Sequence, residues 1–511
     1  MLSSQVSDNK RIAKNTILLY LRLLFSMAVS LYTSRVILNT LGIIDYGIYN
    51  VVGGIVSMFI FLNSAMVTST QRYLTFELGK GNMQRLKEVF SSSIYIHVAI
   101  SLAVVLLTET IGMWFFYEKM VIPSERMTAA MWVFQLSILN MVISIMSAPY
   151  TSAIVAHEHM GAFAVISIAE VLLKLLIVYL LVIGNVDKLI LFAILCASVQ
   201  LLIRFLYTYY CHRYFTETRH VYKPDKLLIK EMGSFAGWNI WGNLAAMLYG
   251  TGLNMLLNVF FGPVVNAARG VAVQVETAVA NFSANFLMAV NPQITKLYAQ
   301  GNLKEMHTLL FRASKFTCFL LFALSLPILL ETETILSLWL KVVPDYTVPF
   351  LRLLLFIVII DSVSRPLMTS AAATGNVKVY QSVIGGILLT IVPIAYIVLR
   401  YGGSPVSVYV VHLSVAVVAF ITRLLIIRPM IHLSISEYVR KVILKCTLVC
   451  CVSFVLSFTF KTVIPSGVLW SLLTCMFSFI MVLGTTYVLG LTRSERAFVR
   501  TKCVSIIHRV I

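Results

Sequence analysis

The sequence predicts an all-α, polytopic integral membrane protein with about fourteen transmembrane helices. Hydrophobic residues make up 59% of the 511 residues and charged residues only 12%, and the mean hydropathy is +0.89. A soluble protein needs far more charge on its surface. Apolar runs of roughly 18 to 25 residues recur along the whole chain, and each is long enough for a helix to cross about 30 Å of hydrocarbon.

The first apolar run follows a polar head and is not succeeded by a cleavage site, so we interpret it as a transmembrane span and not as a signal peptide. No segment between the runs is long enough for a soluble domain, so any function is expected to lie in the membrane. The expected spans lie near residues 14–38, 46–67, 89–116, 129–150, 162–183, 189–210, 232–261, 264–290, 311–331, 347–370, 379–399, 405–427, 440–460 and 467–490.

The net charge of +19 does not indicate nucleic-acid binding, because lysines and arginines cluster in alternate loops. With the N-terminus inside, roughly 27 of them fall in cytoplasmic segments and roughly 7 in external ones, which is a strong positive-inside bias. Both termini are therefore predicted to be cytoplasmic. The basic excess serves orientation and contact with anionic membrane lipids.

Short matches at a separation of about 220 residues indicate an internal repeat. Two parallel six-helix lobes followed by two further helices would explain them, and such repeats are typical of transporters that rock one lobe against the other. The matches pair Leu41-Gly42 with Phe261-Gly262, Gly81-Asn82-Met83 with Gly301-Asn302-Leu303, Pro149 with Pro366, and Gly184 and Arg204 with Gly403 and Arg423.

This repeat predicts six segments. They are a cytoplasmic head (1–13), an N-terminal lobe (14–210), a basic cytoplasmic linker (211–231), a C-terminal lobe (232–427), two additional transmembrane helices (440–490) and a basic cytoplasmic tail (491–511).

Polar residues gather on one side of the eighth expected span, within an arc of about 180° at 100° per residue. A charged side chain facing lipid costs several kcal/mol, so this face is expected to line a cavity or a polar bundle core. The candidate cavity residues on this span are Arg269, Gln274, Asn281 and Asn285, and Glu276 is a candidate for ion or proton coupling.

The first span repeats the arrangement with a stripe that includes Arg22 and Ser26. Arg22 lies two turns inside the span, and no acid on its own helix is within reach. An arginine in this position favours an anionic ligand, because its guanidinium matches phosphate oxygens while amide side chains match sugar hydroxyls.

Two further spans carry an acid four residues before a base. Asp361 precedes Arg365, and Glu170 precedes Lys174. Each pair either neutralises itself along one helix or takes part in function. We treat Arg365 as a cavity candidate and the other three as candidates for ion or proton coupling.

The sequence offers no residues for catalysis, and we expect neither a metal site nor a cofactor beyond coupling to an H⁺ or Na⁺ gradient. No nucleophile-elbow, P-loop or Cys/His ligand pattern occurs. The His157-Glu158-His159 run is not expected to bind zinc, because histidines two residues apart point to different faces.

The ordered motifs SRVILNTLGIIDYGIYNVVGGIV, TQRYLTFELGKGN, AHEHMGAFAVISIAEVLLKL, FGPVVNAARGVAVQVETAVANF and NPQITKLYAQGN resemble the polysaccharide-transporter branch of the multidrug/oligosaccharidyl-lipid/polysaccharide (MOP) exporter superfamily. The resemblance covers essentially the whole chain. It implies a V-shaped bundle that moves an undecaprenyl-pyrophosphate-linked oligosaccharide, an O-antigen or capsule unit, outward across the bacterial inner membrane. It also implies cavity arginines matched by Arg22 and Arg269, and work beside a polysaccharide polymerase and a chain-length regulator.

The sequence leaves two alternative functions open. A multidrug or cation antiporter of the same superfamily would favour buried carboxylates and aromatic residues over arginines. A membrane-embedded glycan polymerase or ligase would need a large external loop with catalytic residues, whereas the longest external loops expected here have only about 15 residues.

Overall fold

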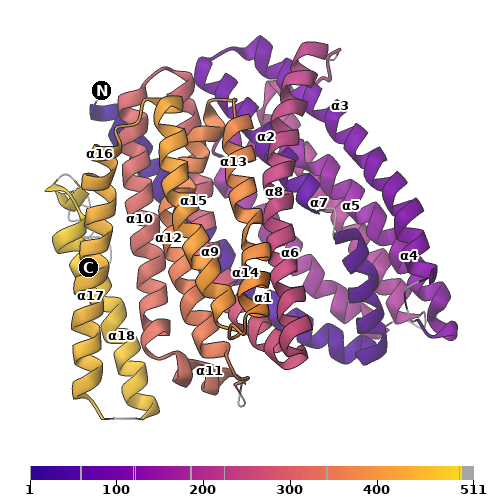
Figure 1. Cartoon of the computed structure of the whole chain (residues 1–511). Coiled ribbons are helices and arrows are strands. Elements are labelled where there is room, and N and C mark those ends of the chain that lie inside the picture. Colours follow the sequence, from indigo (N-terminus) through magenta and orange to yellow (C-terminus); the bar gives the residue numbers. More distant parts are fainter. Residues whose placement is uncertain are drawn as a thin grey trace, which may run out of the picture. The chain divides into compact units, whose positions relative to one another are not determined.

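In the computed structural model, helices joined by turns and loops make up the residues that it describes, and these contain no strand (Figure 1). They are 2–57, 60–118, 120, 122–183, 187–223, 225–340, 343–465, 467–493 and 495–497. This confirms the all-α fold class. Gly184 and most of the predicted basic tail lie outside the described residues.

The longer helices follow one another with short connections. They are α1 (Leu2–Ser57), α2 (Ile60–Lys80), α3 (Met83–Leu107), α5 (Met127–Ala156), α6 (Met160–Ile183), α7 (Lys188–Tyr214), α8 (Lys226–Phe261), α9 (Pro263–Ala299), α10 (Leu303–Leu330), α12 (Thr347–Ala373), α13 (Lys378–Leu389), α14 (Ile391–Arg400), α15 (Ser407–Ile431), α17 (Leu444–Val463) and α18 (Val468–Thr485). The shorter ones are α4 (Met113–Glu118), α11 (Thr332–Leu340) and α16 (Ile435–Tyr438).

Among the described residues, twelve helical segments are long and apolar enough to cross a membrane, so the expected fourteen is an approximation. Helices α2 and α9 have 21 and 37 residues and are not among the twelve. Both are long enough to cross a membrane, but their polar and charged residues lower their mean hydropathy. The chain is therefore an integral, multi-pass membrane protein.

The chain divides into two compact units. The first comprises the chain up to Leu244 together with Met288–Gly301, and the second comprises Ala245–Leu287 together with the chain from Asn302 onward. Helix α8 thus contributes its first part to one unit and its last part to the other, and α9 does the same in the opposite order. The predicted lobe boundaries at 210 and 232 stay a prediction.

The glycines of the sequence repeat adopt matching backbone conformations. Gly42, with φ 80°, breaks the helical course of α1, and Gly262, with φ 78°, separates α8 from α9. Gly81 and Gly301 have φ values of 71° and 72° at the turns that follow α2 and α9. Left-handed conformations of this kind suit glycine, which has no Cβ to clash with the backbone. The repeat therefore preserves its turns as well as its residues.

In the first unit, α5 packs against α2, α3 and α7, and α1 packs against α6. Arg126, at the start of α5, forms ion pairs with Asp45 of α1 and with Asp187, whose carboxylate lies 2.5 Å from the guanidinium. Asp187 also caps α7 by accepting from the backbone N–H groups of Leu189 and Ile190. Burial raises the pKa of Asp187, but the hydrogen bonds from Arg126 and Ile190 outweigh this and hold it below its ordinary value.

Glu158, in the turn between α5 and α6, joins three parts of the first unit. Its carboxylate is 1% exposed and lies 2.9 Å from Arg11 Nε, 2.5 Å from Lys296 Nζ and 2.6 Å from Gln293 Nε2. Its backbone carbonyl accepts from Asn15 Nδ2 at 3.2 Å. The turn thereby binds the start of α1 and the last turns of α9.

In the second unit, α12 packs between α10 and α15, and the α17–α18 hairpin lies along α10 (Figure 1). Two ion pairs join this C-terminal part to α10 and the residue after it. Lys315 Nζ lies 2.9 Å from Glu495, with both side chains buried, and Lys461 Nζ lies 3.1 Å from Glu331. The hairpin is therefore an integral part of the second unit.

We predict that Glu158→Gln lowers the thermal stability of the detergent-solubilised protein, by about 2–3 kcal/mol if measured at equilibrium, because Lys296 and Arg11 lose the carboxylate that neutralises them. The measurement is Tm by a thiol-reactive or intrinsic fluorescence assay.

Glu125→Gln is the matched control for that experiment, because it makes the same chemical change at an exposed position. An unchanged Tm in Glu158→Gln would contradict the role assigned to the carboxylate.

Candidate functional site

The polar residues within the second unit form a candidate functional site built from α8, α9, α12 and α15. Arg269, half-buried in α9, donates to the Gly250 carbonyl at 2.8 Å and to Asn254 Oδ1 at 3.4 Å. Among the described residues its Nε has no hydrogen-bond partner, and no carboxylate forms an ion pair with it. This guanidinium therefore keeps donor capacity for an anionic group.

Asp361 does not pair with Arg365 four residues later on α12, although the spacing permits it. Its carboxylate lies 3.3 Å from Arg423 of α15, whose side chain is 7% exposed. Arg365 is only half-buried. The more deeply buried guanidinium gains more from a carboxylate, since an uncompensated buried charge is costly. Of the two alternatives left open for Asp361 and Arg365, the pair within α12 is therefore not the one that the structure shows.

Glu276 of α9 lies in the same region. It accepts a hydrogen bond from its neighbour Thr277 at 3.3 Å, and the charges of Asp361 and Arg365 act on it electrostatically. Tyr249 of α8 lies within electrostatic range of both carboxylates and 5.2 Å, between ring centroids, from His412 of α15. The cluster thus brings two carboxylates together with three arginines: Arg269, Arg365 and Arg423.

The amides of α9 are divided between two environments. Gln274 and Asn281 are exposed, whereas Asn285 is 7% exposed and donates to the Asn281 carbonyl at 2.9 Å. Two of the three predicted cavity amides are thus accessible. The third, Asn285, uses one of its N–H donors for a hydrogen bond within its own helix.

The first unit holds a smaller cluster around Arg22 of α1. Its guanidinium lies 4.9 Å from the centroid of the Phe163 ring on α6, and Tyr207 and Glu170 act on it electrostatically. Glu170 itself lies 2.6 Å from Lys174. The sequence had shown no acid within reach on α1, and the structure supplies one from α6.

Ser26 is half-buried one turn after Arg22 on α1. It lies on the same stripe of the helix, as expected from the spacing of four residues.

Sequence analysis did not select three buried or half-buried arginines as site residues. Arg204 of α7 lies 5.9 Å from the Tyr150 ring, and Arg72 of α2 lies 4.5 Å and 4.6 Å from the rings of Tyr73 and Phe76. Arg423 is the third. Arg204 and Arg423 occupy matching places in the internal repeat, so this correspondence was the signal that could have identified them.

The His157-Glu158-His159 run directs its three side chains to separate partners. His157 Nε2 lies 2.6 Å from Glu217, its ring stacks on Phe215, and His159 Nδ1 lies 2.9 Å from the Tyr210 hydroxyl. Burial is the main cause that lowers the pKa of His159, and the nearby ammonium group of Lys296 acts in the same direction. Within the described residues, no group of three or more metal-ligating side chains is close enough to hold an ion.

No protein-family model matches the sequence, and no curated protein matches it. Solved structures do match. A multidrug resistance MATE family transporter of the MOP superfamily in an outward-facing conformation aligns with a TM-score of 0.68 and 14% identity, over 82% of this chain and 96% of that chain.

Two further structures are similar to the same degree. A MOP superfamily transporter from Pyrococcus furiosus, whose binding pocket is described as having reverse polarity, aligns with a TM-score of 0.66. The MATE transporter ClbM in complex with Rb⁺ aligns with a TM-score of 0.67. Each is 14% identical, over 84% of this chain and 96% of the other.

The chain therefore has the fold of MATE transporters of the MOP superfamily. These similarities establish the fold and leave the polysaccharide branch a prediction.

We predict that Arg423→Gln destabilises the protein by about 1–3 kcal/mol, because it leaves Asp361 without its partner, and that Arg365→Gln has a much smaller effect. Tm in detergent measures both. The double variant Asp361→Asn/Arg423→Gln is expected to recover part of the loss, since it removes both charges. Equal losses from the two arginine variants would mean that Asp361 pairs along α12 after all.

Proposed function

We propose that the protein is a flippase that moves an undecaprenyl-pyrophosphate-linked oligosaccharide across the bacterial inner membrane by alternating access. The transported unit would be an O-antigen, capsule or related surface polysaccharide repeat. In this proposal the chain acts as a transporter and not as an enzyme.

The observation that carries the proposal is the excess of arginine over acid within the membrane helices of both units. The second unit sets Arg269, Arg365 and Arg423 against Glu276 and Asp361. The first unit sets Arg22 and Lys174 against Glu170. A positive interior attracts an anion and repels a cation, and arginine suits phosphate because its donors form a planar fork.

The remaining polar groups suit the other half of such a substrate. Exposed Gln274 and Asn281 each offer a donor and an acceptor to sugar hydroxyls. The resemblance of the sequence motifs to the polysaccharide-transporter branch supports the same substrate class. Both termini would lie in the cytoplasm, and a polymerase and a chain-length regulator would act on the product.

Coupling to an H⁺ or Na⁺ gradient is part of the proposal. Glu276 and Asp361 are the carboxylates close enough to influence each other, so a cation that binds one changes the charge around the other. Glu170 and Lys174 are paired with each other, and their part in coupling would require that pair to open.

The second candidate function is a multidrug or cation antiporter. It is favoured by the two carboxylates in the second unit, which lie near Tyr249 and His412, and by the similarity to MATE structures. The charge balance of the cluster speaks against a cationic substrate. A glycan polymerase or ligase is a weaker candidate, because it would need catalytic residues on a large external loop.

The test is translocation of a fluorescent undecaprenyl-pyrophosphate oligosaccharide analogue in proteoliposomes. We expect Arg22→Ala/Arg269→Ala to lower the initial rate at least tenfold, because each arginine contributes charge-assisted hydrogen bonds of about 1.5–3 kcal/mol to the pyrophosphate. The assay counts analogue exposed to an external quencher.

Arg213→Ala, at the exposed end of α7, is the control, since it removes a cation from outside the two clusters. Equal translocation rates for wild type and the double variant would contradict the assignment of the two arginines to the site. A wild type that moves no analogue would sink the flippase function.

The antiporter is tested separately by efflux of a fluorescent organic cation against a Na⁺ or H⁺ gradient. We expect wild-type proteoliposomes to show no efflux above protein-free liposomes. Efflux that is abolished in Glu276→Gln/Asp361→Asn would establish the antiporter in place of the flippase.

A further inference from the structure

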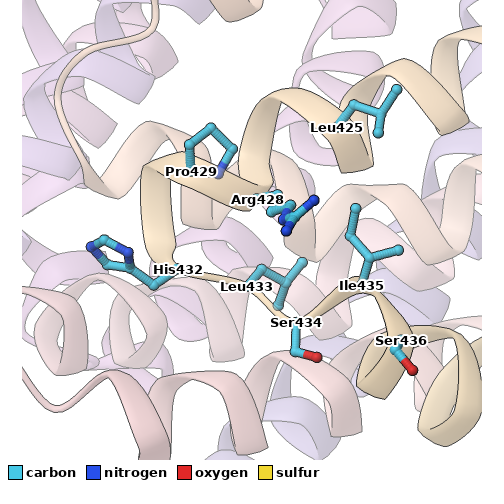
Figure 2. A pocket seen from close by; sticks show the side chains of 8 residues that line it. All are labelled: Leu425, Arg428, Pro429, His432, Leu433, Ser434, Ile435 and Ser436. Atoms are coloured by element: carbon cyan, nitrogen blue, oxygen red, sulfur yellow. The ribbon is translucent and has the colours of Figure 1, made fainter.

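A cavity outside the two arginine clusters lies at the junction of α15 and α16. Its volume is about 860 Å³, and the segments around it belong to the end of one candidate membrane span, Ser407–Ile431, and the start of the next, Ile435–Val463. The cavity is therefore placed where the chain leaves the apolar phase and re-enters it. Figure 2 shows the guanidinium of Arg428 at the centre of the lining side chains.

The backbone between the helices shapes this cavity. His432, the non-glycine residue that follows α15, has φ 53° and ψ 42°, and the N–H groups of His432 and Leu433 both donate to the Arg428 carbonyl. A left-handed residue at this place reverses the chain direction. The turn brings Ser434 and Ser436, at the start of α16, to the cavity that Arg428 occupies (Figure 2).

The polar lining suits a phosphate. Arg428 is exposed, and among the described residues no carboxylate forms an ion pair with it. The hydroxyl of Ser434 accepts from the Glu437 backbone N–H and keeps its own hydrogen for another acceptor. The nearest acid in the sequence, Glu437, is paired with Lys441. The cavity thus presents a guanidinium and hydroxyl donors to an anion.

The apolar lining indicates that the anion is attached to a hydrocarbon chain. Leu425 lines the cavity and is 59% exposed, and it continues a stripe on α15 formed by Val418 and Ile421, which are 52% and 53% exposed. These residues recur at spacings of three and four, so they share one face of the helix. An acyl chain on this stripe would place its phosphate at Arg428.

We propose that this cavity binds the headgroup phosphate of an anionic glycerophospholipid, whose acyl chain lies along the exposed stripe of α15. A zwitterionic lipid fits less well, because the lining contains no carboxylate to receive its ammonium group. The lipid is a resident of the surrounding membrane and not the transported substrate. The inference is thus independent of the proposed function.

The test is native mass spectrometry of the full chain, purified in detergent and titrated with phosphatidylglycerol or phosphatidylcholine of the same acyl chains. We expect wild type to retain phosphatidylglycerol at about tenfold lower concentration than phosphatidylcholine, and Arg428→Gln to remove this difference. Arg428→Lys, which keeps the charge and loses the planar fork, is expected to keep part of it.

Arg400→Gln is the matched control, because it removes an exposed arginine from the end of another membrane helix, outside the cavity. It is expected to behave as wild type. An equal loss of lipid preference in Arg400→Gln, or no loss in Arg428→Gln, would overturn the site.

A second measurement, of Tm with inorganic phosphate or with phosphatidylglycerol, distinguishes a lipid site from a site for a soluble anion. If phosphate raised the Tm of the wild-type protein as much as phosphatidylglycerol does, the cavity would be a soluble-anion site and the lipid assignment would be wrong.

If Arg428→Gln unfolded before lipid was added, the variant His432→Gly would be used in its place. Glycine adopts the left-handed backbone without strain, and enlarges the cavity beside Arg428 by removing one lining side chain. Weakened lipid preference in a variant of undiminished lipid-free Tm would support the site, and unchanged preference would count against it.

Discussion

A charge inside a membrane helix must be compensated by another group of the protein, and much of this structure follows from that constraint. Water cannot hydrate the side chain at that depth, so the protein has to supply a counter-charge, a carbonyl or an aromatic face. The chain uses all three. Asp361 compensates Arg423, the Gly250 carbonyl accepts from Arg269, and the Phe163 ring lies against Arg22. Each contact ties two helices together, so polar residues help to specify the bundle.

The same constraint explains which parts of the fold could be predicted from the sequence. Apolar runs in the sequence predicted about fourteen spans, and among the described residues twelve helical segments are long and apolar enough to cross a membrane. The predicted span 264–290 lies within α9, and the predicted span 46–67 covers the end of α1 and the start of α2. The internal repeat added the positions of turns, because the glycines that follow α2 and α9, Gly81 and Gly301, recur at the repeat separation and share a left-handed backbone.

The candidate site was predictable in its residue types and not in its pairing. Spacing along a helix indicated which side chains share a face, and it allowed the pair that Glu170 forms with Lys174. The same spacing allowed a pair of Asp361 with Arg365, but the partner that Asp361 contacts lies 62 residues away on α15, and no spacing along α12 could indicate it. Glu158 was missed for the same reason: its partners come from α1 and α9, and no local pattern reports them.

The two ion pairs that join the C-terminal part to α10 and to the residue after it have a mechanical consequence. Lys315 and Glu331 are sixteen residues apart, so the attachment points are separated by about 24 Å along the helix direction. A segment attached to α10 at one point could rotate about that point, whereas attachment at two distant points prevents this rotation. The C-terminal part and α10 are therefore expected to move as one stiff body, so that any displacement of α10 would carry α17 and α18 with it.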